Sequence, residues 1–541
     1  MDLYFKSAFL ILLSFITFAF AGTVPWAFTT FLTGILVLLA VLVIRRGLMI
    51  TRPFKIAAAG FLLLIIYTFI QGLSYTNILL SVPPYPASVM PLFTFEHISI
   101  FLSWFAVFTI AVNIPHKFKD TKLLLIFIIV ITLLTAVLHG ALRGDYLALF
   151  TKIKGGVGPF INRNNGGLFL FLGSMATLTM LLTGFAEKYK YTDQNKLQQF
   201  RYKQIALIVL TLIMFTATVF SRSRGAMLAI FNGLLFYSVL LSLFIPHTVQ
   251  RKLILTLIAI ISFTAIGFTA YAYRQEISLF AQRSTTISMD IRQDMYKAAV
   301  KALKQRPYFG YGVGTVPVMI TNYTDMKLTQ HIQQLHNDPL ELLLGIGFVA
   351  FTPLALLVIW FFISVLRHIQ KHSRRKRIFV FGIVSAILAF MISDFFDFHF
   401  DIPACAAAFF AMAGLLCNET FYPQHHTRRP LGYISLSLMF IVFAASLYIP
   451  FQKTAAWRQI NFGRGLKFEA QSTSYQNALN NYPSPRYALK LALAYYNHSL
   501  SKDITPQEKL QLRTQAHELA ETYLKKYPRD KELSKVYQRT L

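Results

Sequence analysis

Charged residues are scarce in this 541-residue sequence, and acidic residues are the scarcest of them. Only 14% of the residues are charged while 55% are hydrophobic, which excludes an ordinary soluble multidomain protein. The 23 Asp and Glu residues are outnumbered by 52 Lys and Arg residues, an excess that would suggest nucleic-acid binding in a soluble protein. Here the basic residues lie in short loops between apolar runs, so we predict an integral membrane protein with no nucleic-acid partner.

Cysteine is nearly absent as well. The two cysteines, Cys405 and Cys417, share one apolar run. Twelve helical residues would separate them by roughly 18 Å, which excludes a disulfide between them. Cysteine therefore gives no information about the redox compartment.

Apolar runs of spanning length are what the sequence has in abundance. We expect an all-α, polytopic helical membrane protein with about 12 or 13 transmembrane helices. The runs are approximately 7–21, 24–44, 56–73, 98–114, 122–139, 167–185, 203–221, 226–245, 253–273, 338–366, 378–395, 403–418 and 432–450. The first is alternatively a signal peptide, because Lys6 precedes it and Ala19-Phe20-Ala21 resembles a cleavage site.

The basic residues predict the orientation of these spans. With a cytoplasmic amino terminus, every inner loop contains Lys or Arg, whereas the outer loops 74–97 and 396–402 contain neither. The odd number of spans then places residues 451–541 outside. The inner clusters are Arg45, Arg46, Arg52 and Lys55; Lys117, Lys119 and Lys122; Lys188, Lys190, Lys196, Arg201 and Lys203; Arg251 and Lys252; Arg367, Lys371 and residues 374–377; and Arg428 and Arg429.

Two domains are expected, a membrane domain over 1–450 that includes an outer loop at 274–337, and an outer helical tail over 451–541. The tail segments SPRYALKLALAYYNHSL and QEKLQLRTQAHELAETYLKKYP are typical of amphipathic helices and resemble a degenerate tetratricopeptide (TPR-like) hairpin. One or two such units cannot form a solenoid, so we expect the tail to pack on the membrane domain or on a partner.

Two arginine-containing motifs lie on the expected outer side, against the topological trend. Arg222 and Arg224 in SRSRG offer guanidinium groups that match phosphate oxygens, the alternative being contacts with lipid headgroups. In GGVGPFINRNNGG, the amides of Asn162 and Asn164 flank Arg163, in a loop that allows close approach of a ligand. A flexible loop that caps the next helix is an equally good interpretation of that second motif.

Two further motifs contain titratable groups. His336, in LHNDP before an apolar run, suits a general base, whereas Asn337 and Asp338 suit a helix cap. The segment SDFFDFHFDIP contains Asp394, Asp397, His399 and Asp401, and its alternation with Phe favours a short extended segment. We expect these acids to pair with the outer arginines or to bind an acceptor sugar in preference to a divalent metal. The segment RPYFGYGVG lacks the Lys and Ser or Thr of a P-loop and is expected to form loop architecture.

In their order, these motifs resemble the O-antigen ligase superfamily, which includes O-antigen ligases, O-antigen polymerases and protein O-oligosaccharyltransferases that modify pilins. The resemblance covers about residues 155–420 and rests on NRNNGG, SRSRGAMLA, R-x3-Y-x2-A, RPYFGYGVG, LHNDPLELLLGIG and DFHFDIPACAAAFFAMAG. It implies a GT-C-like membrane glycosyltransferase that uses an undecaprenyl-diphosphate-linked glycan at the periplasmic face of a bacterial inner membrane, without a cofactor or metal. By motif, it implies catalytic roles for His336, Arg224 and Arg163, and binding of diphosphate or glycan by Arg222, Asn162, Asn164, Arg292 and Asp397.

The acceptor remains open at this point. The first expectation is an O-antigen ligase that acts on a lipid A-core or similar glycolipid, and the alternatives are a polymerase of exopolysaccharide repeat units and a pilin oligosaccharyltransferase. A transporter, from a different class, would show matched intramembrane charges in two halves, a pattern that this sequence lacks. The glycosyltransferase hypothesis requires Arg224 and His336 to meet at one end of the membrane domain.

Overall fold

The computed structural model describes residues 2–76, 83–114, 117–142, 156–186, 194–245, 267, 285–324, 332–418, 432–526 and 530–541. Within these ranges every regular element is a helix, and ten of the helices are long and apolar enough to cross a membrane. The prediction of a polytopic helical membrane protein is therefore confirmed. The expected span at 253–273 lies outside the described residues.

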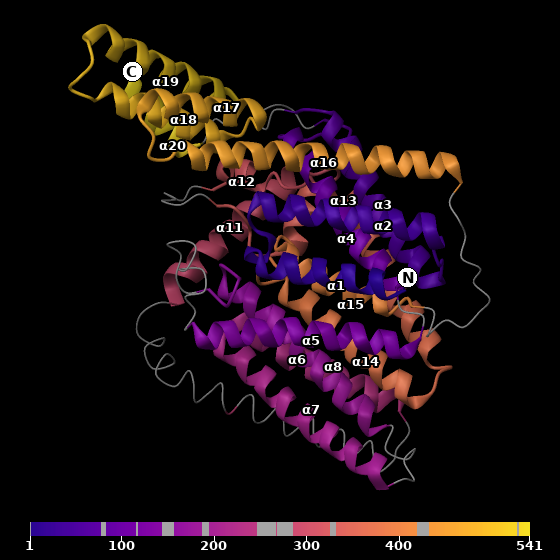
Figure 1. The fold of residues 1–541 in the computed structure, drawn as a ribbon. Helices are drawn as coiled ribbons and strands as arrows, with labels where there is room; N and C mark the ends of the chain where they lie inside the picture. Colours follow the sequence, from indigo (N-terminus) through magenta and orange to yellow (C-terminus); the bar gives the residue numbers. More distant parts are fainter. Residues whose placement is uncertain are drawn as a thin grey trace.

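The other expected spans all coincide with helices that run side by side in Figure 1. The long ones are α2 (Pro25–Arg46), α3 (Arg52–Leu73), α4 (Pro91–Asn113), α5 (Phe118–Ala141), α6 (Arg163–Phe185), α7 (Gln194–Phe220), α8 (Arg224–Phe244), α13 (Asp338–Ile369), α14 (Arg374–Ser393) and α16 (Tyr433–Phe462). Two shorter helices, α1 (Asp2–Phe18) and α15 (Pro403–Leu415), pack among them.

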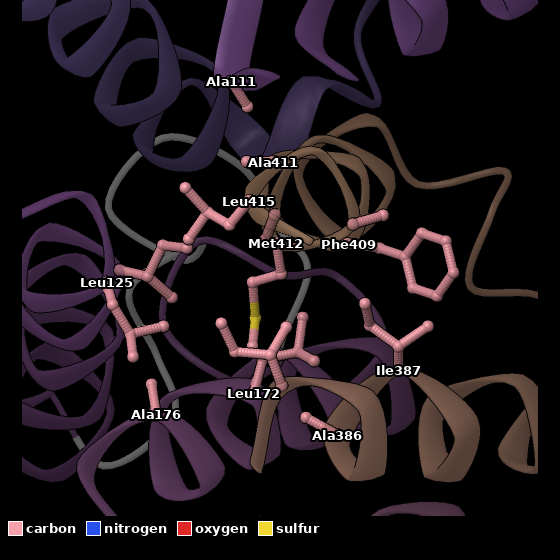
Figure 2. Close-up of a cluster of buried hydrophobic side chains, with 14 of the residues drawn as sticks. Ala111, Leu125, Leu172, Ala176, Ala386, Ile387, Phe409, Ala411, Met412 and Leu415 are labelled. Carbon is pink, nitrogen blue, oxygen red and sulfur yellow. The ribbon is translucent and has the colours of Figure 1, made fainter. Parts of the chain in front are cut away.

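Helix α6 forms the centre of the membrane domain, because 94% of the residues in its most apolar 18-residue stretch are buried. Figure 2 shows Leu172 and Ala176 of α6 in a cluster with Met412 of α15, Ala386 of α14 and Leu125 of α5. Small residues from α14 and α15 alternate with large ones in this cluster, which lets the helices approach closely. A buried helix of this kind gives a rigid support to whatever its two ends carry.

Hydrogen bonds and contacts define two ends of the membrane domain. Helices α6, α8, α13 and α15 begin at one end, hereafter the site end, where α14 finishes: Asp338 donates its backbone N–H to the Asp394 carbonyl, and Ser393 Oγ donates to the Gly225 carbonyl. At the opposite end α3 begins beside the end of α15, since Thr51 Oγ1 donates to the Cys417 carbonyl.

A small second core covers the site end. It contains Met295, Ala298 and Ala302 from α11 (Thr285–Gln305) and Met319 from α12 (Val316–Met319), together with Tyr311. A 3-10 turn, η4 (Ile320–Asn322), completes it. The part of the expected outer loop before residue 285 lies outside the described residues, as do residues 325–331.

Helix α13 is broken near its start, and the segment 307–314 repairs the break. Gly347 has φ +66, so the helical hydrogen bonds around it are lost. The carbonyls of Leu344 and Gly345 instead accept from the N–H groups of Tyr311 and Gly312, at 2.9 and 3.0 Å. In return, the N–H groups of Phe348 and Val349 donate to the carbonyls of Pro307 and Tyr308. Backbone groups freed inside a membrane helix need such partners, and this is the architectural role expected for RPYFGYGVG.

The tail begins as a continuation of α16, which runs past the expected boundary at residue 450. Helices α17 (Phe468–Asn481), α18 (Pro485–Ser499), α19 (Pro506–Lys526) and α20 (Lys531–Thr540) follow and extend beyond the membrane domain in Figure 1. Two of them, α18 and α19, correspond to the predicted amphipathic helices. The tail is anchored on α4, where Glu96 pairs with Lys453 and accepts a hydrogen bond from Tyr482 at 2.6 Å. The TPR-like classification and the domain boundary stay predictions.

Candidate active site

Three polar caps start the helices that meet at the site end. Asn162 caps α6 by accepting from the Asn164 N–H, Ser223 caps α8, and Asn337 caps α13 by accepting from the Leu340 N–H. Each cap satisfies a backbone donor that the first helical turn leaves unpaired. As a result, Arg163 and Arg224 are the first residues of α6 and α8, directly at the positive ends of two helix dipoles.

The two arginine motifs lie against each other. A side chain at Gly167 on the first turns of α6 would meet Ser221 Oγ at 2.5 Å and the Ser223 Cβ at 2.8 Å. The chain can approach this closely because residue 167 is glycine. The starts of α6 and α8 are therefore neighbours. The first carries the exposed Arg163, and the second carries the exposed Arg222 and Arg224.

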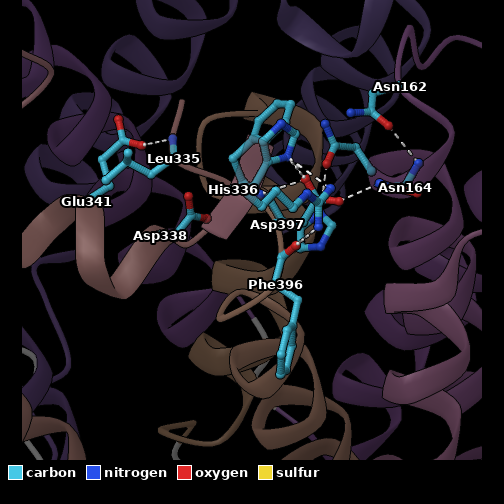
Figure 3. Close-up of polar contacts among 12 residues, drawn as sticks. Asn162, Asn164, Leu335, His336, Asp338, Glu341, Phe396 and Asp397 are labelled. Carbon is cyan, nitrogen blue, oxygen red and sulfur yellow. Dashed lines mark hydrogen bonds and ion pairs between the residues drawn. The ribbon is translucent and has the colours of Figure 1, made fainter. Parts of the chain in front are cut away.

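A histidine–carboxylate pair lies beside these helix starts. His336 Nδ1 is 2.9 Å from Asp397 Oδ1, and Asn164 Nδ2 donates to Asp397 Oδ2 at 2.5 Å. Figure 3 shows His336, Asp397 and Asn164 joined by these contacts, with Asn162 next to Asn164. The side chain of Asp397 is 3% exposed and that of His336 is 30% exposed. The carboxylate is thus enclosed while the imidazole keeps an open face.

The hydrogen between His336 Nδ1 and the Asp397 carboxylate can be assigned to one of the two groups. Burial acts to raise the pKa of Asp397, but the hydrogen bond from His336 and nearby positive charges, Arg292 among them, outweigh it and hold the pKa below its usual value. An ionised carboxylate only accepts, so His336 Nδ1 must carry the hydrogen. The Arg292 Nη2 atom, 3.5 Å from Nδ1, is then a neighbouring charge without a hydrogen bond to the ring. The Nε2 lone pair of a neutral His336 is left available as a base.

The backbone of His336 is held in an unusual conformation. Its φ of +55 lies in the left-handed region, which costs free energy for a residue with a side chain. Tyr296 of α11 donates its hydroxyl to the His336 carbonyl at 3.0 Å, and the ring of Phe398 packs edge-on at 4.9 Å between centroids. Burial, the leading cause, raises the pKa of Tyr296, so its hydroxyl stays a donor. Tyr296 is the tyrosine of the R-x3-Y-x2-A motif, one helical turn after Arg292, and the motif by itself gave it no role.

Arg292 joins α11 to the segment after α14. Its Nη1 donates to the Phe396 carbonyl at 3.0 Å, in the same segment that contains Asp397. This contact fixes the guanidinium near His336. Arg292 therefore lies with the His336–Asp397 pair, as does Asn164.

A second, fully buried row of polar groups lies behind the pair. His399 Nδ1 contacts Asn165 Oδ1 at 2.8 Å, and burial lowers the pKa of His399 to about 4, so this ring stays neutral. Burial first, and the neighbouring carboxylates Asp338 and Asp397 next, raise the pKa of Asp394 well above its usual value. The residue before Asn165 binds Asp397, so this buried row fixes the start of α6 against the 394–402 segment.

The segment 394–402 differs from the extended strand-like form that its alternation of Asp and Phe predicted, and that prediction was wrong. Residues 394–396 and 400–401 form turns. Turns arise because Asp394 ends α14 and because the Phe400 N–H is held by Asp338 Oδ2 at 2.9 Å. The acids consequently face different partners instead of sharing one face. In the part of the chain that the structure describes, no group of three or more His, Cys, Asp or Glu is arranged to hold a metal ion.

The expected site residues thus divide into two sets by their contacts. His336, Asp397, Asn164 and Arg292 are joined by direct contacts, and Asn162 holds the Asn164 backbone. Arg163, Arg222 and Arg224 lie on the adjoining helix starts, with Gly225 of the second start bonded to Ser393 just before the 394–402 segment. Arg224 and His336 are accordingly at the same end of the membrane domain.

Comparison with known proteins identifies the central part of the chain. Residues 209–355 match the model of the O-antigen ligase family, a stretch that contains Arg222, Arg224, Arg292 and His336. An uncharacterized protein of Haemophilus influenzae is 25% identical over 276 residues, which cover 47% of this chain and 65% of that protein. The match to the family model includes α8, α11 and the start of α13, and it leaves out α6 and segment 394–402. Residues 209–355 therefore form a domain of the O-antigen ligase family.

Proposed function

We propose that this protein transfers a glycan from undecaprenyl diphosphate to an acceptor hydroxyl at the periplasmic face of a bacterial inner membrane. The observation that carries the proposal is the His336–Asp397 pair beside two helix starts that each begin with arginine. A base and a set of fixed cations are the two elements that displacement of a diphosphate from a sugar requires. The O-antigen ligase domain supports the same reaction class.

His336 is the base in the proposed mechanism. Asp397 accepts the Nδ1 hydrogen, which orients the ring and stabilises the imidazolium that forms when Nε2 takes the acceptor proton. The acceptor oxygen forms a bond to the anomeric carbon as the bond from that carbon to the diphosphate oxygen breaks. We expect a single displacement with inversion, and this stereochemistry rests on analogy with the family.

The arginines receive the leaving group. Arg224 and Arg163 stabilise the negative charge that develops on the diphosphate, and Arg222 extends the same surface. The helix starts reinforce them, because α6 and α8 direct their positive dipole ends to the same region. Asn162, Asn164 and Arg292 position the glycan and the diphosphate around the pair.

A glycolipid such as lipid A-core is the acceptor that we favour, which makes the protein an O-antigen ligase. A protein acceptor is the second candidate, because the tail docks through Glu96 on α4 and adds a helical surface beyond the site end. The glycan of a null strain distinguishes the possibilities. Polymerised glycan stranded on its lipid carrier indicates a ligase, unmodified pilin indicates a protein transferase, and single repeat units indicate a polymerase.

The direct test uses the full-length protein in proteoliposomes with lipid-linked donor. His336→Ala and Arg224→Ala should each abolish glycan transfer while the protein inserts normally. Arg52→Ala is the matched control for Arg224, since Arg52 is also the exposed first residue of a membrane helix after a hydroxyl cap, but at the opposite end. Transfer at the wild-type rate by either site variant would refute the proposal.

A further inference from the structure

A cavity of about 180 Å³ lies at the opposite end of the membrane domain, far from the candidate active site. Its lining comes from the start of α5, the end of α6 and the start of α7, and includes Lys122, Gly184, Lys196, Lys203 and Gln204. Some twenty residues of α6 separate Gly184 from Asn164, which is roughly 30 Å along the helix axis. This is about the thickness of the hydrocarbon core of a bilayer. The cavity and the active site therefore belong to opposite membrane surfaces.

The lining of the cavity is strongly basic. Lysines from two helices, Lys122 of α5 and Lys196 and Lys203 of α7, converge on it, and the lining residues that the structure describes include no Asp or Glu. Three lysines around one cavity favour the binding of an anion within it. Positive charge at the cytoplasmic end is ordinary for a membrane protein, but topology alone requires only that lysines lie in the loops.

Gln204 contributes a buried amide to the lining of the cavity. Gln204 is 5% exposed, and its Oε1 atom has no hydrogen-bond partner within the described part of the chain. The amide packs so closely on α6 that a side chain at Gly184 would lie 2.1 Å from Gln204 Nε2. A buried polar atom without a partner costs free energy unless a ligand or water completes it. The cavity is also far larger than a single water needs.

We propose that this cavity binds the headgroup of an anionic phospholipid from the cytoplasmic leaflet. The lysines pair with the phosphate, and the Gln204 amide bonds a headgroup hydroxyl of the kind that phosphatidylglycerol carries. The apolar lining residues Met180, Phe200 and Leu207 contact the upper part of the acyl chains. Basic pockets between membrane helices at the cytoplasmic surface bind anionic headgroups in this way. The proposal uses the orientation given above but not the transferase activity.

The test measures lipid binding by the full-length protein in detergent. Native mass spectrometry and thermal unfolding are followed while dioleoyl phosphatidylglycerol, dioleoyl phosphatidylethanolamine or inorganic phosphate is added. Only phosphatidylglycerol should form a retained adduct and raise the unfolding temperature. Lys203→Gln should weaken binding about fivefold, and Lys122→Gln/Lys196→Gln/Lys203→Gln roughly 100-fold. Lys55→Gln is the matched control, an exposed lysine at the same end but outside the cavity, and should bind as the wild type does.

Gln204→Leu keeps every lysine and removes the amide, so it separates recognition of the headgroup from simple charge attraction. It should lower the preference for phosphatidylglycerol over phosphatidic acid, which lacks the hydroxyls. Equal stabilisation by inorganic phosphate or by phosphatidylethanolamine would overturn the proposal. Unchanged phosphatidylglycerol binding by a triple variant that unfolds at the wild-type temperature without added lipid would overturn it as well.

Discussion

Two loop segments at the site end, 307–314 and 394–402, both contact the start of α13. One does so through its backbone and the other through its side chains. The first contributes backbone: its N–H and carbonyl groups replace the helical hydrogen bonds lost around Gly347. The second contributes side chains: Asp397 binds His336 and Asn164, and His399 binds Asn165. The same helix start is thus held in shape by one segment and supplied with chemistry by the other.

A prominent sequence motif can thus reflect either the backbone conformation or the chemistry of the side chains. Glycines at 310, 312 and 314 all have positive φ, so the sequence of the first segment is dictated by backbone conformation. In the second segment Asp394, Asp397 and His399 are buried polar groups, and their contribution depends on their partners. Substitutions should therefore reduce stability in the first segment and activity in the second.

The largest expected effect is that of Asp397→Asn. The new amide presents a donor to His336 Nδ1, which favours the wrong tautomer of the ring, so glycan transfer should fall roughly 10²- to 10⁴-fold. The unfolding temperature should change little in comparison. Asp294→Asn, which removes an exposed ion pair with Lys297, is the control and should retain the activity. If Asp397→Asn transferred glycan at a rate within twofold of wild type, the carboxylate would have no part in the mechanism.

Gly310→Ala tests the backbone segment. Gly310 has φ +70, and a Cβ there would lie 2.4 Å from the Gly345 carbonyl oxygen. We expect a loss of about 3 kcal/mol in the free energy of unfolding, measured in detergent by denaturant titration. Gly140→Ala in α5 meets nothing within 4 Å and should be neutral or slightly stabilising. Equal stabilities for the two variants would contradict the role given to segment 307–314.

The pH dependence of stability tests the buried row behind Asp397. The pKa of His399 is about 4 in the folded protein against 6.5 for an ordinary histidine, so the unfolded chain binds a proton first as the pH falls. His399 should therefore contribute a loss of stability from about pH 6.5 to about pH 4, on the order of 3 kcal/mol. Asp394, whose folded pKa is raised, contributes the opposite slope above its usual pKa, and the contribution of Asp397, whose folded pKa is lowered, is lost only at still lower pH. The test is the difference between wild type and His399→Gln: the variant should lose stability less steeply between pH 6.5 and pH 4, and an unchanged slope would exclude His399.

The smallest effect is expected for Gln71→Leu in α3. Gln71 Nε2 donates at 2.8 Å to the carbonyls of Phe309 and Gly345 and so ties segment 307–314 to the broken helix. Its loss should cost about 1–2 kcal/mol of stability. Thr68→Val, one turn earlier, removes a buried hydroxyl that has no partner among the described residues and should cost nothing. A neutral Gln71→Leu variant would show that the backbone hydrogen bonds hold the segment alone.

Local patterns were sufficient for most of the fold. Apolar runs predicted the membrane helices, and the polar residues before α13 predicted its cap, because both signals depend on residues within one or two helical turns. The helix α11 was missed, although Met295, Ala298 and Ala302 repeat at helical spacing and form its buried face. The turns of 394–402 were missed because the alternating pattern gives no information about the Asp338 side chain that holds them.

The sequence by itself determined which segments are long and apolar enough to cross a membrane and which residues are chemically suited to a phosphate-displacing site. Only the tertiary structure decided that Asp397 pairs with His336, 61 positions away, and that Asn164 completes the carboxylate. The physical reason is range: caps and apolar periodicity act within a few residues. The pairing of buried polar groups instead depends on how α6, α13 and α14 pack, which is the sum of many side-chain contacts along their whole lengths.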